Sequence, residues 1–395
     1  MIESPFAKSW SLDAHITFLN HGSFGACPHE VVALQDEIRA KMEREPVSFF
    51  VRTLEPLLDE SRAALGELVH ANPDDIAFVS NATAGVNTVV RSLVFEPGDE
   101  ILTTDHAYNA CKNALLYVAE RHRAKVVVAK VPFPISSPEE ITEAVVARVT
   151  PKTKLALIDH VTSPTALIFP VAEITRALQA RGVAVLIDGA HAPGMVALDF
   201  EALAPDYYTG NCHKWLCAPK GAAFLYARRD RQKGLRPLSI SHGANSSRTD
   251  RTRFRLEFDW AGTDDPSAFL SVKAAIDFLS RQMPGGLAAV RTHNHALAVK
   301  ARTILCETLD VKPPCPEMML GSMATVPIAD GNGAPPIGPV GLDALQARLH
   351  DEFGIEVPVF AWPAPPRRLL RVSAQLYNHE GQYRKLAETL RRIPS

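Results

Sequence analysis

The stretch VAVLIDGAH at residues 183–191 decides the fold class of this chain. Five apolar residues run directly into Asp188 with no polar residue between them. A continuously apolar, β-branched run is typical of a strand that is buried on both faces, as in parallel sheets covered by helices. Short apolar runs also occur at 76–79, 100–104, 125–130, 154–160 and 222–227, and helical stretches such as 109–121, 139–149 and 170–181 lie between most of them. We therefore predict an α/β fold with a mostly parallel, doubly wound sheet.

The length of 395 residues exceeds what one hydrophobic core usually organises, so two domains are expected. After residue 265 the pattern changes, because helical stretches at 266–281 and 285–309 precede Pro-rich turns and a closing helix from about 379. We expect a large domain over residues 18–265 and a smaller α+β domain over 266–395, joined by the N-terminal segment 1–17.

The composition is that of an ordinary soluble protein, and the formal net charge of −2 suggests neither nucleic acid nor a membrane surface as a partner. The six cysteines are scattered without a Cys-x-x-Cys pair, which favours free thiols in a reducing compartment. The first residues lack the basic start and apolar core of a signal peptide, and no apolar run is long enough to span a membrane. A cytoplasmic location is expected.

Two motifs place reactive side chains at predicted strand ends, which is where sheets of this kind bind ligands. Asp188 ends its strand, although a lone Asp there also fits a turn or a helix N-cap, and His191 also fits a surface histidine. Lys214 lies between His213 and Trp215 in YYTGNCHKWLCAPKG (207–221). It is either a surface lysine or an amine nucleophile whose pKa the apolar, aromatic surroundings lower.

The turn after the run at 76–79 carries small polar residues where a helix is expected to begin. Ser80, Asn81 and Thr83 occupy this turn in IAFVSNATAGVN. They are either ordinary N-capping residues or a phosphate cradle of hydroxyls and backbone N–H groups, since both use the same geometry.

Two further strand ends carry rings and hydroxyls. His106 and Tyr108 follow the run at 100–104, as rings that stack on a planar ligand or as packed loop residues. Thr162 and Ser163 follow the run at 154–160, as hydrogen-bond donors or as turn residues. An amine, a carboxylate, a phosphate cradle and a stacking ring on neighbouring strand ends together match the requirements of pyridoxal 5'-phosphate (PLP).

The sequence resembles the class V aminotransferase family of PLP enzymes, and within it the isopenicillin N epimerase-like branch. The resemblance extends from Phe18 to about Leu390. It rests on the motifs FLNHGSFGACP (18–28), EPVSFFVR (45–52), NATAGVN (81–87), DHAYNA (105–110), HVTSPT (160–165), DGAH (188–191), GNCHKW (210–215) and RVSAQLYN (371–378). It implies the aspartate-aminotransferase-like fold and a homodimer with shared active sites.

The resemblance also implies a role for each matching residue. Lys214 is the lysine that forms the Schiff base with the cofactor, Asp188 pairs with its ring nitrogen, and His106 stacks on the ring, with Tyr108 as the second candidate. The phosphate contacts would be Ala82 (backbone), Thr83, Asn211 and His213, and Thr263 would contact the phosphate of the neighbouring subunit. Ser163 and His191 would contact the phenolate oxygen of the cofactor. The substrate would contact Arg371, Asn20 and Arg52. Arg371 would bind the substrate α-carboxylate with its planar guanidinium.

One departure narrows the reaction. Cysteine desulfurases of this class carry a mobile cysteine shortly before the equivalent of Arg371, whereas residues 352–370 here contain none. A persulfide-forming desulfurase is therefore not expected. The reaction expected first is epimerisation at the α-carbon of an amino acid, with Lys214 as the general base and Tyr108 or His106 as the proton donor on the other face. The alternative is a C–S β-lyase of the cysteine desulfhydrase or hercynylcysteine sulfoxide lyase type, and transamination comes third. A non-catalytic binding protein is disfavoured because Lys214, Asp188 and Arg371 are all present.

Overall fold

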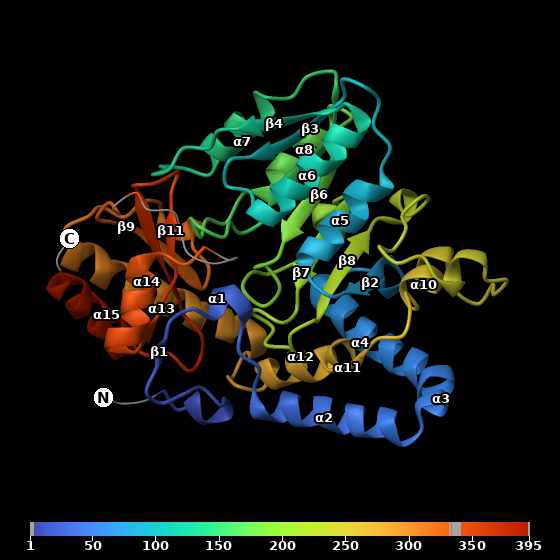
Figure 1. The fold of residues 1–395 in the computed structure, drawn as a ribbon, viewed down its shortest axis with the longest axis horizontal. Helices are drawn as coiled ribbons and strands as arrows, with labels where there is room; N and C mark the ends of the chain where they lie inside the picture. The colour runs from blue at the N-terminus through green and yellow to red at the C-terminus, as the bar shows by residue number, and fades with distance from the viewer. Residues whose placement is uncertain (1–3, 332, 334–340, 394–395) are drawn as a thin grey trace.

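The computed structural model describes residues 4–331, 333 and 341–393, and its centre is a seven-stranded sheet (Figure 1). The strand order is β2-β8-β7-β6-β5-β3-β4, and only β8 runs antiparallel to its neighbours in this sheet. The mostly parallel sheet predicted from the sequence is thus confirmed. The strands are β2 (Ile76–Val79), β3 (Glu100–Thr104), β4 (Lys125–Ala129), β5 (Thr153–Asp159), β6 (Ala184–Gly189), β7 (Tyr207–Asn211) and β8 (Ala223–Ala227).

Both faces of this sheet are buried, which explains the continuously apolar runs. Along β5, Leu155 and Leu157 belong to one hydrophobic cluster, whereas Ala156 and Ile158 belong to the other. The helices that connect the parallel strands cover the sheet, and they begin close to the positions expected from the sequence. They are α5 (Ala82–Ser92), α6 (Asn109–His122), α7 (Glu139–Val146) and α8 (Val171–Gln179).

The C-terminal part contains a second, smaller sheet of three antiparallel strands, which lies beside the large one (Figure 1). Its order is β11-β12-β9, with β9 (Met323–Ile328), β11 (Val359–Ala361) and β12 (Arg368–Ser373). The helices of this part are α13 (Gly286–Leu309), α14 (Ala344–Phe353) and α15 (Glu380–Arg392). The N-terminal strand β1 (Thr17–Phe18) pairs with β10 (Ile355–Glu356). We retain the division into 18–265 and 266–395 as a proposal.

Of the remaining helices, those within residues 29–69 and 267–280 lie below the large sheet in the view of Figure 1, and the one at 253–258 lies to its right. The remaining helices are α1 (His21–Phe24), α2 (His29–Arg44), α3 (Pro46–Ser48), α4 (Leu54–Val69), α9 (Phe200–Leu203), α10 (Arg253–Phe258), α11 (Ser267–Leu270) and α12 (Val272–Ser280). The helix expected over 266–281 is therefore interrupted at Ser271. In the described residues, no helix combines the length and the apolar character needed to cross a bilayer.

A buried ion pair joins α4 to the end of α10. The Arg62 side chain is fully buried, and its guanidinium lies 2.6 Å from Asp259 Oδ1. Arg62 also donates a hydrogen bond of 2.5 Å to the carbonyl oxygen of Ile76 in β2. Asp259 accepts a second hydrogen bond, 3.0 Å long, from Arg255 in α10. Because a buried cation without its partner is expensive, this carboxylate should contribute strongly to stability.

We predict that Asp259→Ala lowers the free energy of unfolding by about 3–5 kcal/mol, since it leaves the Arg62 charge buried and without its carboxylate. The matched control is Asp277→Ala, which removes the exposed Lys273–Asp277 pair and should cost less than about 1 kcal/mol. Urea unfolding followed by far-ultraviolet circular dichroism measures both changes. Equal effects of the two substitutions would contradict the prediction.

Candidate active site

A cavity of about 510 Å³ lies at the carboxyl ends of β5, β6 and β7, beside the first turn of α5. Its volume is in the range of small-molecule and cofactor sites, and its position is the one expected for this class of sheet. It is lined by Ser23, Phe24, Ser80, Asn81, Ala82, Thr83, Tyr108, Asp159, Val161, Ser163, Asp188, Ala190, His191, Asn211, His213, Lys214 and Gly221. Nine of the residues predicted from the sequence are among them: Ala82, Thr83, Tyr108, Ser163, Asp188, His191, Asn211, His213 and Lys214.

The Lys214 amine lies in the loop after β7 with its Nζ 3.2 Å from His191 Nε2. Trp215 donates its indole N–H to His191 Nδ1 over 3.4 Å, so the imidazole proton belongs on Nε2. His191 Nε2–H then points to Lys214, and only a neutral amine can accept this hydrogen bond. Loss of water around the amine and the charge of Arg371 lower the pKa of Lys214 to about 7.

The loop that carries Lys214 is held by the N-terminal NHGSFG turn. His21 donates from Nε2 to the Lys214 carbonyl oxygen at 3.0 Å and accepts from the Tyr377 hydroxyl at Nδ1, 2.7 Å away. Burial lowers the pKa of His21 to about 3, so the ring is neutral and has one N–H to give. Gly25 has φ of 70°, and a Cβ there would lie 2.0 Å from the carbonyl oxygen of His213. The two segments can approach this closely only because residue 25 is glycine.

Asp188, the last but one residue of β6, lines the cavity and accepts two hydrogen bonds. Its Oδ1 accepts from the Ala190 backbone N–H at 3.0 Å, and its Oδ2 accepts from the Cys111 thiol at 3.1 Å. Burial raises the pKa of Asp188, whereas these donors and the Lys214 charge act in the opposite direction. A carboxylate in this position fits the predicted partner of a protonated ring nitrogen.

The start of α5 forms another part of the cavity lining. Asn81 caps this helix by accepting the Ala84 backbone N–H at 2.8 Å. The N-terminus of a helix favours anions, so this end suits a phosphate. The Ala82 N–H, predicted to contact the phosphate, donates instead to Asn211 Oδ1 at 2.8 Å. Thr83 lines the cavity beside it.

Arg371 in β12 of the small sheet lies outside the cavity lining but contacts two residues that belong to it, Ser163 and Ser23. Its guanidinium donates to the Ser163 carbonyl oxygen at 2.7 Å, to Ser163 Oγ at 3.2 Å and to Ser23 Oγ at 3.2 Å, and it lies 5.0 Å from the centre of the Phe360 ring. In the part of the chain that the structure describes, no carboxylate forms an ion pair with it. Burial lowers its pKa to about 10. A buried cation with only neutral partners is suited to bind an anion from outside the chain.

The structure does not bring His106 into the cavity lining. The His106 ring is fully buried, its Nδ1 lies 2.8 Å from Thr165 Oγ1 and its Nε2 lies 3.1 Å from the Val131 carbonyl oxygen. The ring also packs against Trp362, with 4.5 Å between the centroids. The stacking role predicted for His106 therefore receives no support from the cavity lining and stays a prediction. We propose Tyr108, which lines the cavity, as the stacking residue instead.

Three more predicted residues lie outside the lining. Asn20 donates a hydrogen bond of 2.9 Å to Glu356, and Arg52 is exposed in the π-helical segment Phe49–Thr53. Thr263 lines a second cavity. Their predicted roles therefore receive no support from contacts within a single chain.

The sequence reading missed Ser23, Phe24 and Asp159, which all line the cavity, and Cys111, which donates to Asp188. The available signal for Asp159 was the same as for Asp188, namely a carboxylate at the end of a buried strand. Cys111 offered no such signal, because its partner is 77 positions away in the sequence.

Comparison with known proteins agrees with this geometry. The family model for class V aminotransferases matches residues 28–334. The chain belongs to the class V aminotransferase family. It is 35% identical to isopenicillin N epimerase of Streptomyces clavuligerus, covering 96% of this chain and 95% of the relative. It is 30% identical to a probable chloroplastic L-cysteine desulfhydrase of Arabidopsis thaliana, covering 98% of this chain and 84% of the relative.

The solved structures show the same fold at low sequence identity. The cystine C–S lyase C-DES in complex with cysteine persulfide superposes with a TM-score of 0.80 and 22% identity, over 97% of this chain and 99% of that one. A mutant of C-DES with glycine covalently linked to its PLP cofactor gives a TM-score of 0.79 and 22% identity, over 96% and 97% of the two chains.

As a member of the class V aminotransferase family, the protein is a PLP-dependent enzyme, and the residues around its cavity fit this cofactor. An amine with a lowered pKa, a buried carboxylate and a helix N-terminus border one space, as the aldehyde, ring nitrogen and phosphate of PLP require. We propose Lys214, Asp188 and the Asn81–Thr83 turn, with Asn211 and His213, as the residues that hold these three groups.

We predict that the cofactor-free protein captures PLP faster as the pH rises through about 7, because the Lys214 amine is protonated below this pKa and neutral above it. Stopped-flow absorbance measures the rate. Arg371→Leu is the matched variant, and it should move the inflection to higher pH by removing a neighbouring positive charge. An inflection near the ordinary lysine pKa of about 10.4 would contradict the prediction.

Proposed function

We propose that this enzyme epimerises the α-carbon of an amino-acid substrate. The main observation behind this proposal is the placement of Lys214 and Tyr108. Lys214 lies on the loop after β7 and Tyr108 on the loop after β3, and in the sheet these strands are on either side of β6, which carries Asp188. Epimerisation requires a base on one face of the α-carbon and an acid on the other, and these two side chains reach the same cavity from different strands. The identity to isopenicillin N epimerases over almost the whole chain supports the same reading.

The side chains divide the chemistry between them. Arg371 would bind the substrate α-carboxylate and thereby fix the orientation of the α-carbon hydrogen. Lys214, released as a neutral amine, would remove the α-proton as general base. Bound PLP supplies the electron sink that makes this proton acidic. Asp188 would keep the positive charge at the ring nitrogen in place.

Tyr108 would return a proton on the opposite face. Burial raises the pKa of its hydroxyl, so the group keeps its proton at neutral pH and has one to donate. The side chain lines the cavity and remains about half exposed, which allows the proton to be replaced from solvent.

A C–S β-lyase is the second candidate. It requires the same base and the same carboxylate site but no acid opposite Lys214, since the β-substituent leaves instead. The observation in its favour is the identity to L-cysteine desulfhydrases, which reaches 30% over 98% of this chain. Transamination remains the third possibility.

The two candidates predict different products in deuterated water. With a panel of L-amino acids, an epimerase gives the D-isomer with deuterium at the α-carbon, as measured by chiral chromatography and mass spectrometry. Release of pyruvate from L-cysteine or cysteine conjugates without any D-isomer would overturn the epimerase proposal and support the lyase.

Tyr108→Phe sharpens this experiment, because it keeps the ring and removes only the hydroxyl. We predict a loss of D-isomer formation of about 10²-fold or more, while exchange of deuterium into the L-substrate through Lys214 continues. Equal losses of both activities would argue that the hydroxyl is not the second acid.

We also propose that two chains form a homodimer in the cytoplasm. Thr263 lines a second cavity together with Trp260 and Leu238, and Ser80 borders both cavities. Leu238 is 50% exposed beside this cavity, which is consistent with an apolar contact to a second copy. The six cysteines are unpaired, as expected in a reducing compartment.

Leu238→Asp should dissociate the dimer, because it places a charge in an apolar contact. Analytical ultracentrifugation then gives the single-chain mass of 43.1 kDa instead of twice that value. The control is Met318→Asp, which changes a residue that is 74% exposed in the C-terminal part. A monomeric wild-type protein, or dissociation by both variants, would contradict the predicted interface.

A further inference from the structure

A second buried carboxyl group stands next to Asp188. Asp159 ends β5, Asp188 is the last but one residue of β6, and the two residues are paired in the parallel ladder. Paired residues project to the same face of a sheet, so both carboxyl groups face the cavity that they line. They are 4% and 3% exposed. The proposed mechanism uses Asp188 and leaves Asp159 without a role.

The hydrogen bonds of the two carboxyl groups differ. Asp188 accepts the Ala190 N–H and the Cys111 thiol, one on each oxygen. Within the described residues, by contrast, Oδ2 of Asp159 is buried and has no hydrogen-bond partner. Donors directed at both oxygens stabilise an anion, whereas an oxygen without a donor can carry a proton.

The surrounding charges act in the same direction. The Asp188 charge opposes ionisation of Asp159, and protonation of Lys214 would favour the ionised form of Asp188 further. The Cys111 thiol and the hydroxyls of Tyr108 and Tyr208 also interact with Asp188, and burial raises the pKa of each of these groups, so they keep their protons. Burial and the charge of Asp188 likewise raise the pKa of Asp159. Two like charges in a dry site share a proton instead of both ionising.

We propose that Asp159 is a positioning residue that retains its proton, so that the carboxyl pair carries one negative charge, located on Asp188. One anion then faces one protonated ring nitrogen, and the charges match. This inference rests on the proposed role of Asp188 toward the cofactor.

Matched amide substitutions at the two paired positions test which carboxyl group is charged. Asp159→Asn preserves size and neutrality, so the affinity of the cofactor-free protein for PLP should change by less than about threefold. Asp188→Asn removes the anion and should weaken the same affinity by more than about tenfold. Absorbance titration measures both, and far-ultraviolet circular dichroism checks folding. A loss in Asp159→Asn equal to that in Asp188→Asn would overturn the proposal.

Infrared spectroscopy detects directly whether the Asp159 carboxyl group is protonated. At neutral pH, the wild-type minus Asp159→Asn difference spectrum should contain the carbonyl stretch of a protonated carboxylic acid, which shifts when the protein is labelled with carboxyl-¹³C aspartate. Carboxylate bands alone in this difference would overturn the proposal. Asp159→Ser, which also lacks an ionisable group, replaces the amide variant if that variant does not fold.

These experiments test the role of Asp188 toward the ring nitrogen and the protonation of Asp159 separately. Full PLP affinity in Asp188→Asn would remove the proposed role of Asp188 toward the ring nitrogen. The acid band would still show whether Asp159 holds the proton of the pair.

Discussion

The removal of the Lys214 amine from water is the constraint on which the rest of the site depends. An ammonium in this position would lie beside the buried cation of Arg371, and burial of a charge without a close partner is costly. The neutral amine avoids this cost and becomes an acceptor, which fits the His191 tautomer set by Trp215. The same neutrality makes the amine a nucleophile and a base near pH 7, so one desolvation effect serves binding and chemistry.

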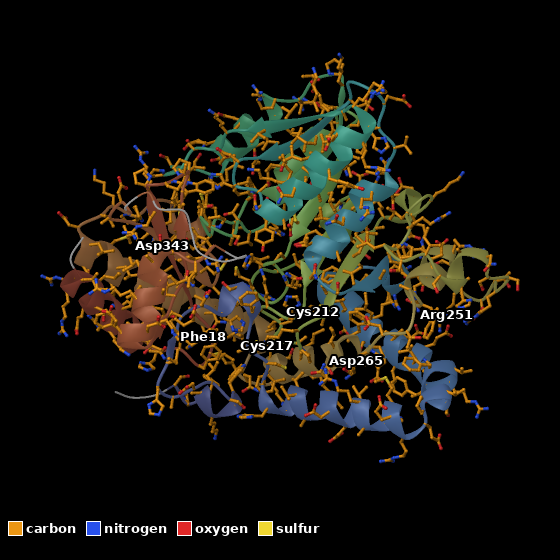
Figure 2. All side chains as sticks on the ribbon, in the orientation of Figure 1. Phe18, Cys212, Cys217, Arg251, Asp265 and Asp343 are labelled. Atoms are coloured by element: carbon orange, nitrogen blue, oxygen red, sulfur yellow. The ribbon has the colours of Figure 1, made fainter. Side chains whose placement is uncertain are left out.

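This environment is assembled from distant parts of the chain. The Lys214 loop leaves the large sheet, Arg371 comes from the small sheet, and the His21–Gly25 turn lies against the loop while His21 hydrogen-bonds Tyr377 near the C-terminus. Figure 2 places Cys212 and Cys217, which flank Lys214 in the sequence, in the middle of the molecule. The amine is therefore buried only when the N-terminal turn and the C-terminal part are both in place, which couples formation of the site to folding of the whole chain.

The sequence predicted the parts of this arrangement that local pattern specifies. Apolar runs located six of the seven strands of the large sheet, whereas β7 escaped because Tyr207–Asn211 mixes aromatic, small and polar residues although all five are buried. Strand-end position identified Lys214 and Asp188 but could not separate His106 from Tyr108. Which of these two faces the cavity depends on Val131, Thr165 and Trp362, which meet His106 only in three dimensions. Thr263 lies outside the candidate active-site cavity of its own chain, so its predicted contact with a cofactor phosphate requires a second chain.

Groups of opposite charge preference border different parts of the cavity. The anion of Asp188 lies at the sheet, the N-terminus of α5 attracts negative charge at another border, and Arg371 supplies the only buried cation contacting the lining from the small sheet among the described residues. We propose that this arrangement orients a ligand that carries a phosphate, a ring nitrogen and a carboxylate before any bond to its α-carbon changes. Binding is thus common to every reaction considered for this family. Epimerisation, unlike elimination, requires a proton donor on the face of the α-carbon away from Lys214, and we propose the hydroxyl of Tyr108, which lines the same cavity, as that donor.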